Sequence, residues 1–290
     1  MIERTIRAGP IDFACLEAGK GPTVLLLHGF PDHNRSFRPL IEALAKAGSR
    51  AIAANLPGYS PTSPEPAGDY HLSIISRHIG SLIDSLGEKK IHLVGHDWGA
   101  GIAYVSAVLF PEKLHSITTM AVPHLRAIST GFRKQPSQFR RSWYMFFFQL
   151  PFVPERALRA NDLRLIEWFW SHWSPGWNWN RHEMESLKAT FQKPGVVKAA
   201  LAYYRALKDV TSPEGRRTRK LGFSPVPVRT LALTGDTDGC VTTRLYDYMD
   251  SAFFPAGLEI RRIPHAGHFL HLEQPSTINR AVLEFLTKQE

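Results

Sequence analysis

Residues 94–101 read VGHDWGAG and join the apolar run IHLV (91–94) to the apolar helical pattern IAYVSAVLF (102–110). Glycines on both sides of Asp97 mark a corner that is too tight for larger side chains. The stretch therefore predicts a strand, a sharp turn and a helix in immediate succession, with a carboxylate at the centre of the turn. Aspartate is common as a helix N-cap, so the stretch by itself fits either a cap or a reactive group held above a strand end.

Short apolar runs recur along the chain on both sides of this corner. Runs of this length suit strands that are buried on both faces of a parallel sheet. They lie at 23–30, 50–60, 90–97, 115–123, 228–238 and, more weakly, 258–264. Helical patterns alternate with them at 37–48, 72–87, 101–111 and 276–289. This alternation predicts an α/β fold with a mostly parallel, twisted sheet flanked by helices and joined by right-handed crossovers.

One stretch interrupts the alternation. From about 124 to 220 no buried strand is apparent, and the pattern is helical and rich in aromatic residues. The segment WFWSHWSPGWNWN (168–180) holds five of the seven tryptophans. We therefore predict a core domain of residues 1–123 and 221–290 and a helical cap of residues 124–220. Most of these tryptophans are expected in the core of the cap, and some beside an apolar cavity.

The composition excludes several classes of protein. Hydrophobic residues make up 43% and charged residues 21% of the 290 residues, as in ordinary globular proteins. The net charge is +9, but the basic residues are scattered, and the run RRTRK (216–220) is interpreted as a solvated loop. Two cysteines make neither a disulfide framework nor a metal cluster. No signal peptide and no apolar run of roughly 18 residues is apparent, so we expect a cytoplasmic protein with no nucleic-acid partner and no stable membrane insertion.

The segment from Gly95 to Gly99 resembles the nucleophile elbow of the α/β-hydrolases, in which small residues flank the nucleophile. The resemblance implies an α/β-hydrolase fold with an inserted cap, and it makes Asp97 the nucleophile. A serine here would suggest an esterase or lipase. An aspartate suggests attack on an sp3 carbon, with a covalent ester as intermediate.

Further motifs of that family follow other predicted strands. His28-Gly29-Phe30-Pro31 resembles its HGxP segment, which implies that the N–H groups of Phe30 and Trp98 form an oxyanion hole. From the same likeness, we expect His28, Pro31, Trp98 and Tyr203 beside the substrate pocket.

The acid and the histidine come later in the chain. LTGDTDGC (233–240) resembles the acid segment and points to Asp238, with Asp236 as a competitor. HAGHFLHLEQP (265–275) resembles the histidine segment and points to His268. We interpret His265 and His271 as structural or surface residues. The order nucleophile, acid, histidine is that of the family.

Within that family the chain resembles the soluble epoxide hydrolases. SWYMFFFQLP (142–151) and LAYYRALKD (201–209) resemble the segments that carry the two cap tyrosines, which implies Tyr144 and Tyr204 as donors to the epoxide oxygen. A phenol with a pKa of about 10 stays protonated at neutral pH. The alternative is a structural role, in which both tyrosines belong to the core of the cap. The implied reaction takes a small apolar epoxide and water to a vicinal diol, without metal or organic cofactor, in a monomer or homodimer.

Three alternatives remain open. A haloalkane dehalogenase shares the aspartate and the tryptophan after it, but usually has an Asn where this chain has Phe30, or a second tryptophan. A fluoroacetate dehalogenase would have arginines just after the nucleophile, where this chain has Trp98-Gly99-Ala100. A non-catalytic ligand-binding protein could use the same fold, but it would not need the set Asp97, Asp238 and His268.

Overall fold

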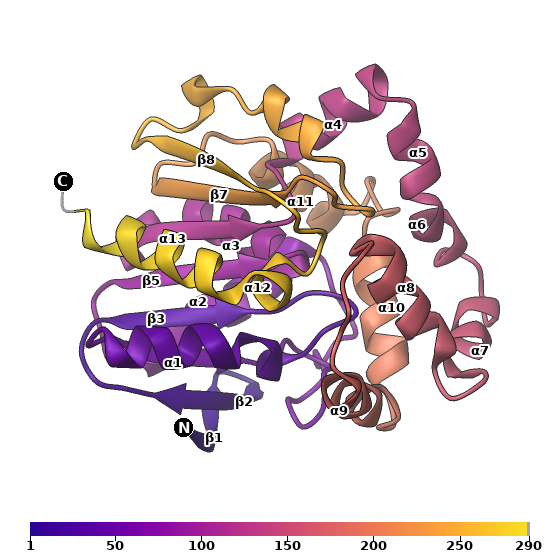
Figure 1. Cartoon of the computed structure of the whole chain (residues 1–290), viewed down its shortest axis with the longest axis horizontal. Helices are drawn as coiled ribbons and strands as arrows, with labels where there is room; N and C mark the ends of the chain where they lie inside the picture. Colours follow the sequence, from indigo (N-terminus) through magenta and orange to yellow (C-terminus); the bar gives the residue numbers. More distant parts are fainter. Residues whose placement is uncertain (289–290) are drawn as a thin grey trace.

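An eight-stranded sheet forms the centre of the computed structural model, which describes residues 1–288 (Figure 1). The strand order is β1-β2-β4-β3-β5-β6-β7-β8. The first two strands form an antiparallel hairpin, β2 pairs antiparallel with β4, and the others pair in parallel. The strands are β1 Ile2–Ala8, β2 Ile11–Ala18, β3 Thr23–Leu27, β4 Arg50–Ala54, β5 Ile91–His96, β6 Leu114–Met120, β7 Arg229–Gly235 and β8 Leu258–Ile263.

All six predicted strands are present, so the predicted α/β class is confirmed. The observed strands are up to six residues shorter because the polar and glycine-rich ends of the predicted runs leave the sheet as loops. The hairpin of β1 and β2 was not expected. Its first strand is largely exposed, so it lacks the continuous apolar run of a buried strand.

Helices cover both faces of the sheet, and alternate strand residues point to opposite faces. Val24 and Leu26 pack with α1 (Arg38–Lys46) and α13 (Pro275–Thr287), whereas Leu25 and Leu27 face α2 (Leu72–Ser85) and α3 (Trp98–Leu109). The predicted helices are thereby confirmed; residue 289 of the last one lies outside the described residues. Short helices complete the core: α12 Leu270–Glu273 and the 3-10 helices η1 Asn34–Phe37, η2 Pro111–Lys113, η3 Thr243–Tyr248 and η4 Ser251–Phe253.

The chain between β6 and β7 consists of helices joined by loops, and within the described residues it contains no strand. Figure 1 shows α5 to α10 gathered at one end of the sheet. The helices are α4 Leu125–Lys134, α5 Ser137–Arg141, α6 Trp143–Phe147, α7 Val153–Arg159, α8 Arg164–Trp173, α9 Arg181–Phe191, α10 Val196–Ala206 and α11 Pro213–Gly222. The helical character predicted for residues 124–220 is confirmed, while the division into core and cap domains stays a prediction.

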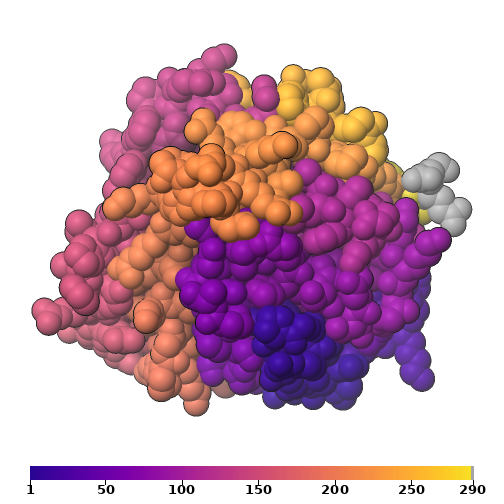
Figure 2. All heavy atoms as spheres, turned by 180° about the vertical axis from the view of Figure 1, so that it is seen from behind, coloured from indigo at the N-terminus to yellow at the C-terminus, as the bar shows by residue number. Residues whose placement is uncertain are grey.

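The last helix of this insertion packs on the core. Glu214 accepts a hydrogen bond of 2.7 Å from the Ser73 hydroxyl of α2, and Figure 2 shows α11 (orange) against core atoms (purple). The two ends of the insertion also meet, since a Cβ on Gly222 would lie 2.6 Å from the Leu125 side chain. The basic run 216–220 is solvated as expected, but it belongs to α11, so the interpretation as a loop is wrong. Within residues 1–288, no helix has the length and apolar character of a membrane span.

Candidate active site

Asp97 sits on a strained corner between β5 and α3, with φ 51° and ψ −113°. A Cβ on Gly95 would collide with the backbone of Gly99, and a Cβ on Gly99 would collide with the carbonyl of Leu27. Both glycines are therefore required by close backbone contacts. A Cβ on Gly29 would likewise collide with the Asp97 side chain, so this glycine leaves room for the carboxylate.

The Asp97 side chain caps no helix N–H within the described chain. Its Oδ1 atom instead accepts a hydrogen bond of 2.8 Å from the backbone N–H of Phe30, in the loop after β3. The structure thus joins two of the sequence motifs at one carboxylate oxygen. The contact predicted from the Trp98 N–H stays a prediction.

Asp97, Asp238 and His268 come together at the carboxyl ends of β5, β7 and β8, and all three are buried. His268 Nδ1 donates to Asp238 Oδ2 at 3.0 Å, and His268 Nε2 lies 3.5 Å from Asp97 Oδ2. The other Asp238 oxygen accepts from the backbone N–H groups of Cys240 (2.7 Å) and Val241 (2.8 Å). The competing carboxylate, Asp236, is exposed to solvent.

The two carboxylates determine the charge of the imidazole between them. Burial alone would lower the pKa of His268, but the charges of Asp238 and Asp97 outweigh it and raise that pKa to about 10. At neutral pH His268 is therefore an imidazolium, paired on both sides. Such a group can act as a base only after one of the two negative charges is removed.

Two tyrosines from the insertion line the same cavity as Asp97. Tyr144 comes from α6 and Tyr204 from α10, and their ring centroids are 5.7 Å apart. Burial raises the pKa of each phenol well above 10, so both stay protonated and can donate. The Tyr144 hydroxyl lies 3.2 Å from Cys240 Sγ. Within residues 1–288, the Tyr204 hydroxyl and Trp98 Nε1 are buried without a hydrogen-bond partner.

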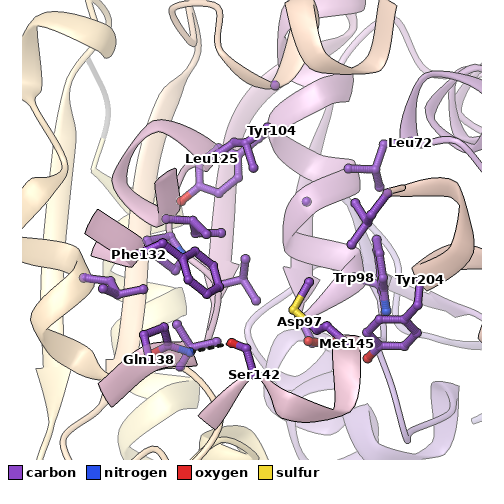
Figure 3. A pocket seen from close by; sticks show the side chains of 18 of the residues that line it. Leu72, Asp97, Trp98, Tyr104, Leu125, Phe132, Gln138, Ser142, Met145 and Tyr204 are labelled. Carbon is purple, nitrogen blue, oxygen red and sulfur yellow. Dashed lines mark hydrogen bonds between the residues drawn. The ribbon is translucent and has the colours of Figure 1, made fainter. Parts of the chain in front are cut away.

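Figure 3 shows Tyr204 and Trp98 beside Asp97 at one end of a cavity of about 160 Å³. Its walls are mainly apolar, and the lining residues include Leu72, Val105, Val122, Leu125, Ile128, Phe132 and Met145. A mainly apolar cavity with a few polar groups at one end is the usual form of a small-molecule site.

Of the four residues predicted beside the pocket, only Trp98 is in the cavity lining within the described chain. His28, Pro31 and Tyr203 are occupied elsewhere. The Nε2 atom of His28 accepts from the Leu56 N–H at 3.0 Å, and the carbonyl of Pro31 accepts from Trp170 at 2.9 Å. Tyr203 donates to the carbonyl of Pro57 at 3.0 Å. These three residues hold the loops around the site together.

Sequence reasoning missed a second polar cluster beneath the site. The side chains of Asp32, His96 and His271 are fully buried, and both imidazoles lie 3.6 Å from Asp32 Oδ2. Burial would raise the pKa of Asp32, but His271 and His96 hold it far below its usual range. His96 Nε2 also donates to the backbone carbonyl of His268 at 3.0 Å. His96 and His271 belong to the quoted motifs and Asp32 directly follows another, but their polarity gave no signal of burial.

Two buried groups have donor atoms close enough to share a cation: Asp32 with His96 and His271, and Asp238 with Cys240 and His268. The second is part of the Asp–His arrangement itself. In the first, Asp32 also accepts hydrogen bonds from the Ser36 hydroxyl and the His33 N–H. The hydrogen bonds and ion pairs of both groups explain their arrangement without a metal ion.

Comparisons with known proteins show which family has this fold. Residues 22–275 match the family model described as alpha/beta hydrolase fold. Epoxide hydrolase 3 of Siraitia grosvenorii is 31% identical over 98% of each chain, and the AB hydrolase superfamily protein YfhM of Bacillus subtilis is 29% identical over 93% of this chain and 91% of that one. The crystal structure of epoxide hydrolase VrEH1 from Vigna radiata superposes with a TM-score of 0.84 at 27% identity, covering 99% of this chain and 98% of that one. The chain therefore belongs to the α/β-hydrolase superfamily and, within it, to the epoxide hydrolase-like proteins.

Proposed function

We propose that this protein hydrolyses epoxides to vicinal diols through a covalent ester on Asp97. The observation that carries the proposal is the pairing of groups around one apolar cavity: a carboxylate faces two phenols that burial keeps protonated. A carboxylate supplies the nucleophile, and phenols supply hydrogen-bond donors for the oxygen that leaves the carbon.

In the first step Asp97 Oδ2 attacks a ring carbon, because Oδ1 is held by the Phe30 N–H. A carbon–oxygen bond of the ring breaks, and a phenol of Tyr144 or Tyr204 protonates the alkoxide. The phenol regains a proton from solvent, and the His268 imidazolium gives up its proton to solvent once the Asp97 charge is lost. The products of this step are a neutral ester and a neutral imidazole.

The ester then changes the electrostatics of His268. Alkylation removes the Asp97 charge, one of the two that raise the pKa of His268, whereas the burial that lowers this pKa remains. The imidazole can now take a proton from water, and the hydroxide adds to the ester carbonyl. The N–H of Phe30, with that of Trp98, stabilises the oxyanion at Oδ1. Collapse of this adduct returns a proton to the diol and restores the carboxylate and the imidazolium.

The second candidate is a haloalkane dehalogenase. The observation in its favour is the buried Trp98 Nε1, which has no hydrogen-bond partner within residues 1–288 and could donate to a halide ion. Within the described chain it would be the only such donor. Phe30 stands where many such enzymes have a second donor, an asparagine, and two phenols are not needed for a halide that leaves without a proton. The geometry therefore supports the epoxide better.

A side-by-side assay separates these candidates. We expect the purified protein to convert styrene oxide to its diol and to release no halide from 1-chlorohexane or 1-bromohexane. Halide release without diol formation would favour the dehalogenase. Binding of either compound without any turnover would favour the non-catalytic protein.

Mass spectrometry tests the covalent step. In His268→Gln the nucleophile remains but the base is lost, so the ester should form and persist. The intact protein should gain the mass of one epoxide, located at Asp97 by peptide mapping. A matched His271→Gln variant, which leaves Asp238 and His268 in place, should show no stable adduct. A folded His268→Gln protein that binds the epoxide and gains no mass would contradict the covalent route.

A further inference from the structure

The cavity extends away from Asp97 along α3, and Leu72 of α2 lines it on the side of Trp98 (Figure 3). Beyond the polar end it runs between α3 and α4, past Val105, Ile128 and Phe132, as far as Leu245 of η3. Figure 3 shows Leu125 and Phe132 on the far side of the cavity from Tyr204. This part of the cavity, which we call the arm, is lined by hydrocarbon and suits an apolar substituent.

Aromatic rings that do not line the cavity pack against the reacting groups. Six side chains from core and insertion pack there, each at most 2% exposed, and within the described chain none is in the cavity lining: Phe30, Tyr59, Phe148, Phe169, Trp173 and Phe191. The Trp173 ring centroid is 4.8 Å from that of Tyr144 and 5.2 Å from that of His268. The Phe148 centroid is 5.0 Å from that of Tyr204. We call this set the aromatic wall.

The arm and the wall together restrict the shape of the substrate. In the proposed function the epoxide oxygen points to Tyr144 and Tyr204 while a ring carbon faces Asp97. With these atoms fixed, a substituent on one ring carbon can enter the arm, but a substituent on the other meets the wall. We propose that the preferred substrates are terminal epoxides, in which one ring carbon carries only hydrogen and the other carries a compact apolar group. This inference rests on the proposed function and adds the substrate class to it.

The size of the cavity sets the size of that group. Its volume is about 160 Å³. An apolar cavity of about 150 Å³ in another protein holds one benzene molecule. The arm is only part of this volume, so it suits a substituent no larger than a single ring, such as a short alkyl chain.

Two isomeric epoxides test the inference without changing the protein. 1,2-Epoxyhexane and trans-2,3-epoxyhexane have the same atoms, but only the second has carbon on both ring positions. We expect kcat/KM to be about 10- to 100-fold higher for the terminal isomer, the range typical of one misplaced methyl or methylene group in a pocket. Equal values, or a preference for the internal isomer, would overturn the inference while leaving epoxide hydrolysis intact. No turnover of either isomer, or of styrene oxide, would overturn the proposed function and this inference with it.

Variants of the wall and the arm provide an independent check. Trp173→Leu removes bulk beside Tyr144 and His268, so it should raise kcat/KM for the internal isomer relative to the terminal one by about 10-fold. Phe148→Leu is the second wall variant and should act in the same direction. Ile128→Trp fills the arm, so it should lower kcat/KM for 1,2-epoxyhexane and spare the smaller 1,2-epoxypropane. Arg133→Trp, at an exposed position of the same helix, should change neither value. An unchanged isomer ratio in a folded wall variant, together with an unaffected Ile128→Trp, would overturn the inference.

Discussion

Asp97 has a strained backbone conformation, and several hydrogen bonds hold it in place. A non-glycine residue at φ 51° costs of the order of 1–3 kcal/mol, and the conformation persists only where neighbouring contacts enforce it. Here the Asp97 N–H donates to the Met120 carbonyl, and its own carbonyl accepts from Ala100 and Gly101. These contacts keep the Asp97 backbone in its strained conformation, which places the carboxylate at the carboxyl edge of the sheet, facing Phe30 and His268.

The two aspartates after β7 are a matched pair for mutagenesis. Asp238→Asn places an amide where the carboxylate accepts from His268 Nδ1, so it removes the charge that stabilises the imidazolium and disturbs the imidazole tautomer. We expect turnover to fall by about a thousandfold or more, in line with the loss of such a residue in other Asp–His pairs. Asp236→Asn changes an exposed side chain and should leave kcat within a factor of about two of wild type, as surface substitutions generally do. Steady-state kinetics with styrene oxide would measure both, and a larger loss in Asp236→Asn would contradict the assignment.

The predicted residues Asp97, Asp238 and His268 could be found in the sequence because each lies just after an apolar strand, within a recognisable spacing. His28, Pro31 and Tyr203 show the limit of that reasoning. A motif can place a residue near a site, but whether its side chain faces the cavity depends on packing. His271 was expected to be structural or at the surface, and it is buried against Asp32, a contact that joins positions far apart in the chain.

At the scale of helices, the site depends on two elements of the insertion. The five-residue α6 supplies Tyr144 and α10 supplies Tyr204, and each helix turns its phenol toward a carboxylate anchored on the sheet. Their tyrosines could be identified from local motifs. The helix boundaries could not, because aromatic residues are spread over the whole insertion and give no clean periodicity.

Tyr144→Phe and Tyr204→Phe should each slow the first chemical step. Each change keeps the ring and removes one donor, which is typically worth about a hundredfold in rate at sites of this kind. Tyr144 also loses its contact with Cys240, so Cys240→Ala serves as the control for that contact and should affect adduct formation far less. The rates are measured by single-turnover mass spectrometry of adduct formation, with each tyrosine variant built in the His268→Gln background. If the double tyrosine variant alkylates Asp97 at the parent rate, the phenols belong only to the core of the cap.

The N-terminal hairpin marks the other limit of prediction at this scale. Its strands alternate charged and apolar residues around Gly9, as expected of an edge with one face in water. Continuous apolar runs therefore predict the buried strands but do not predict the two strands at the edge of the sheet.

For the whole molecule, the charge at the site couples to the stability of the fold. The folded-state pKa of His268 is raised to about 10 from an ordinary value of 6.5. A raised pKa means that the folded protein holds this proton more tightly than the unfolded chain. The resulting stabilisation is complete below about pH 6.5 and is lost as the pH rises through about 10.

His268→Gln lacks this stabilisation at every pH. The difference in free energy of unfolding between wild type and His268→Gln should therefore shrink from about pH 6.5 to about pH 10, with a slope of at most about 1.4 kcal/mol per pH unit. Urea unfolding of both proteins over that range gives the difference and cancels the titration of other groups. A difference that stays constant or grows with pH would show that His268 is not held as an imidazolium.

The contact between Leu125 and Gly222 has a consequence for how the chain folds. Pairing β6 with β7 closes a loop of about a hundred residues, which costs an unfolded chain about 4 kcal/mol in conformational entropy. If the insertion folds before β7 pairs with β6, its two ends already lie side by side. The loop that remains to be closed is then as short as an ordinary connection between strands. Early formation of the helical insertion would thus lower the entropic barrier to adding β7 and β8. Those strands deliver Asp238 and His268, so in such a folding order Asp97 would gain its partners only after the insertion has formed.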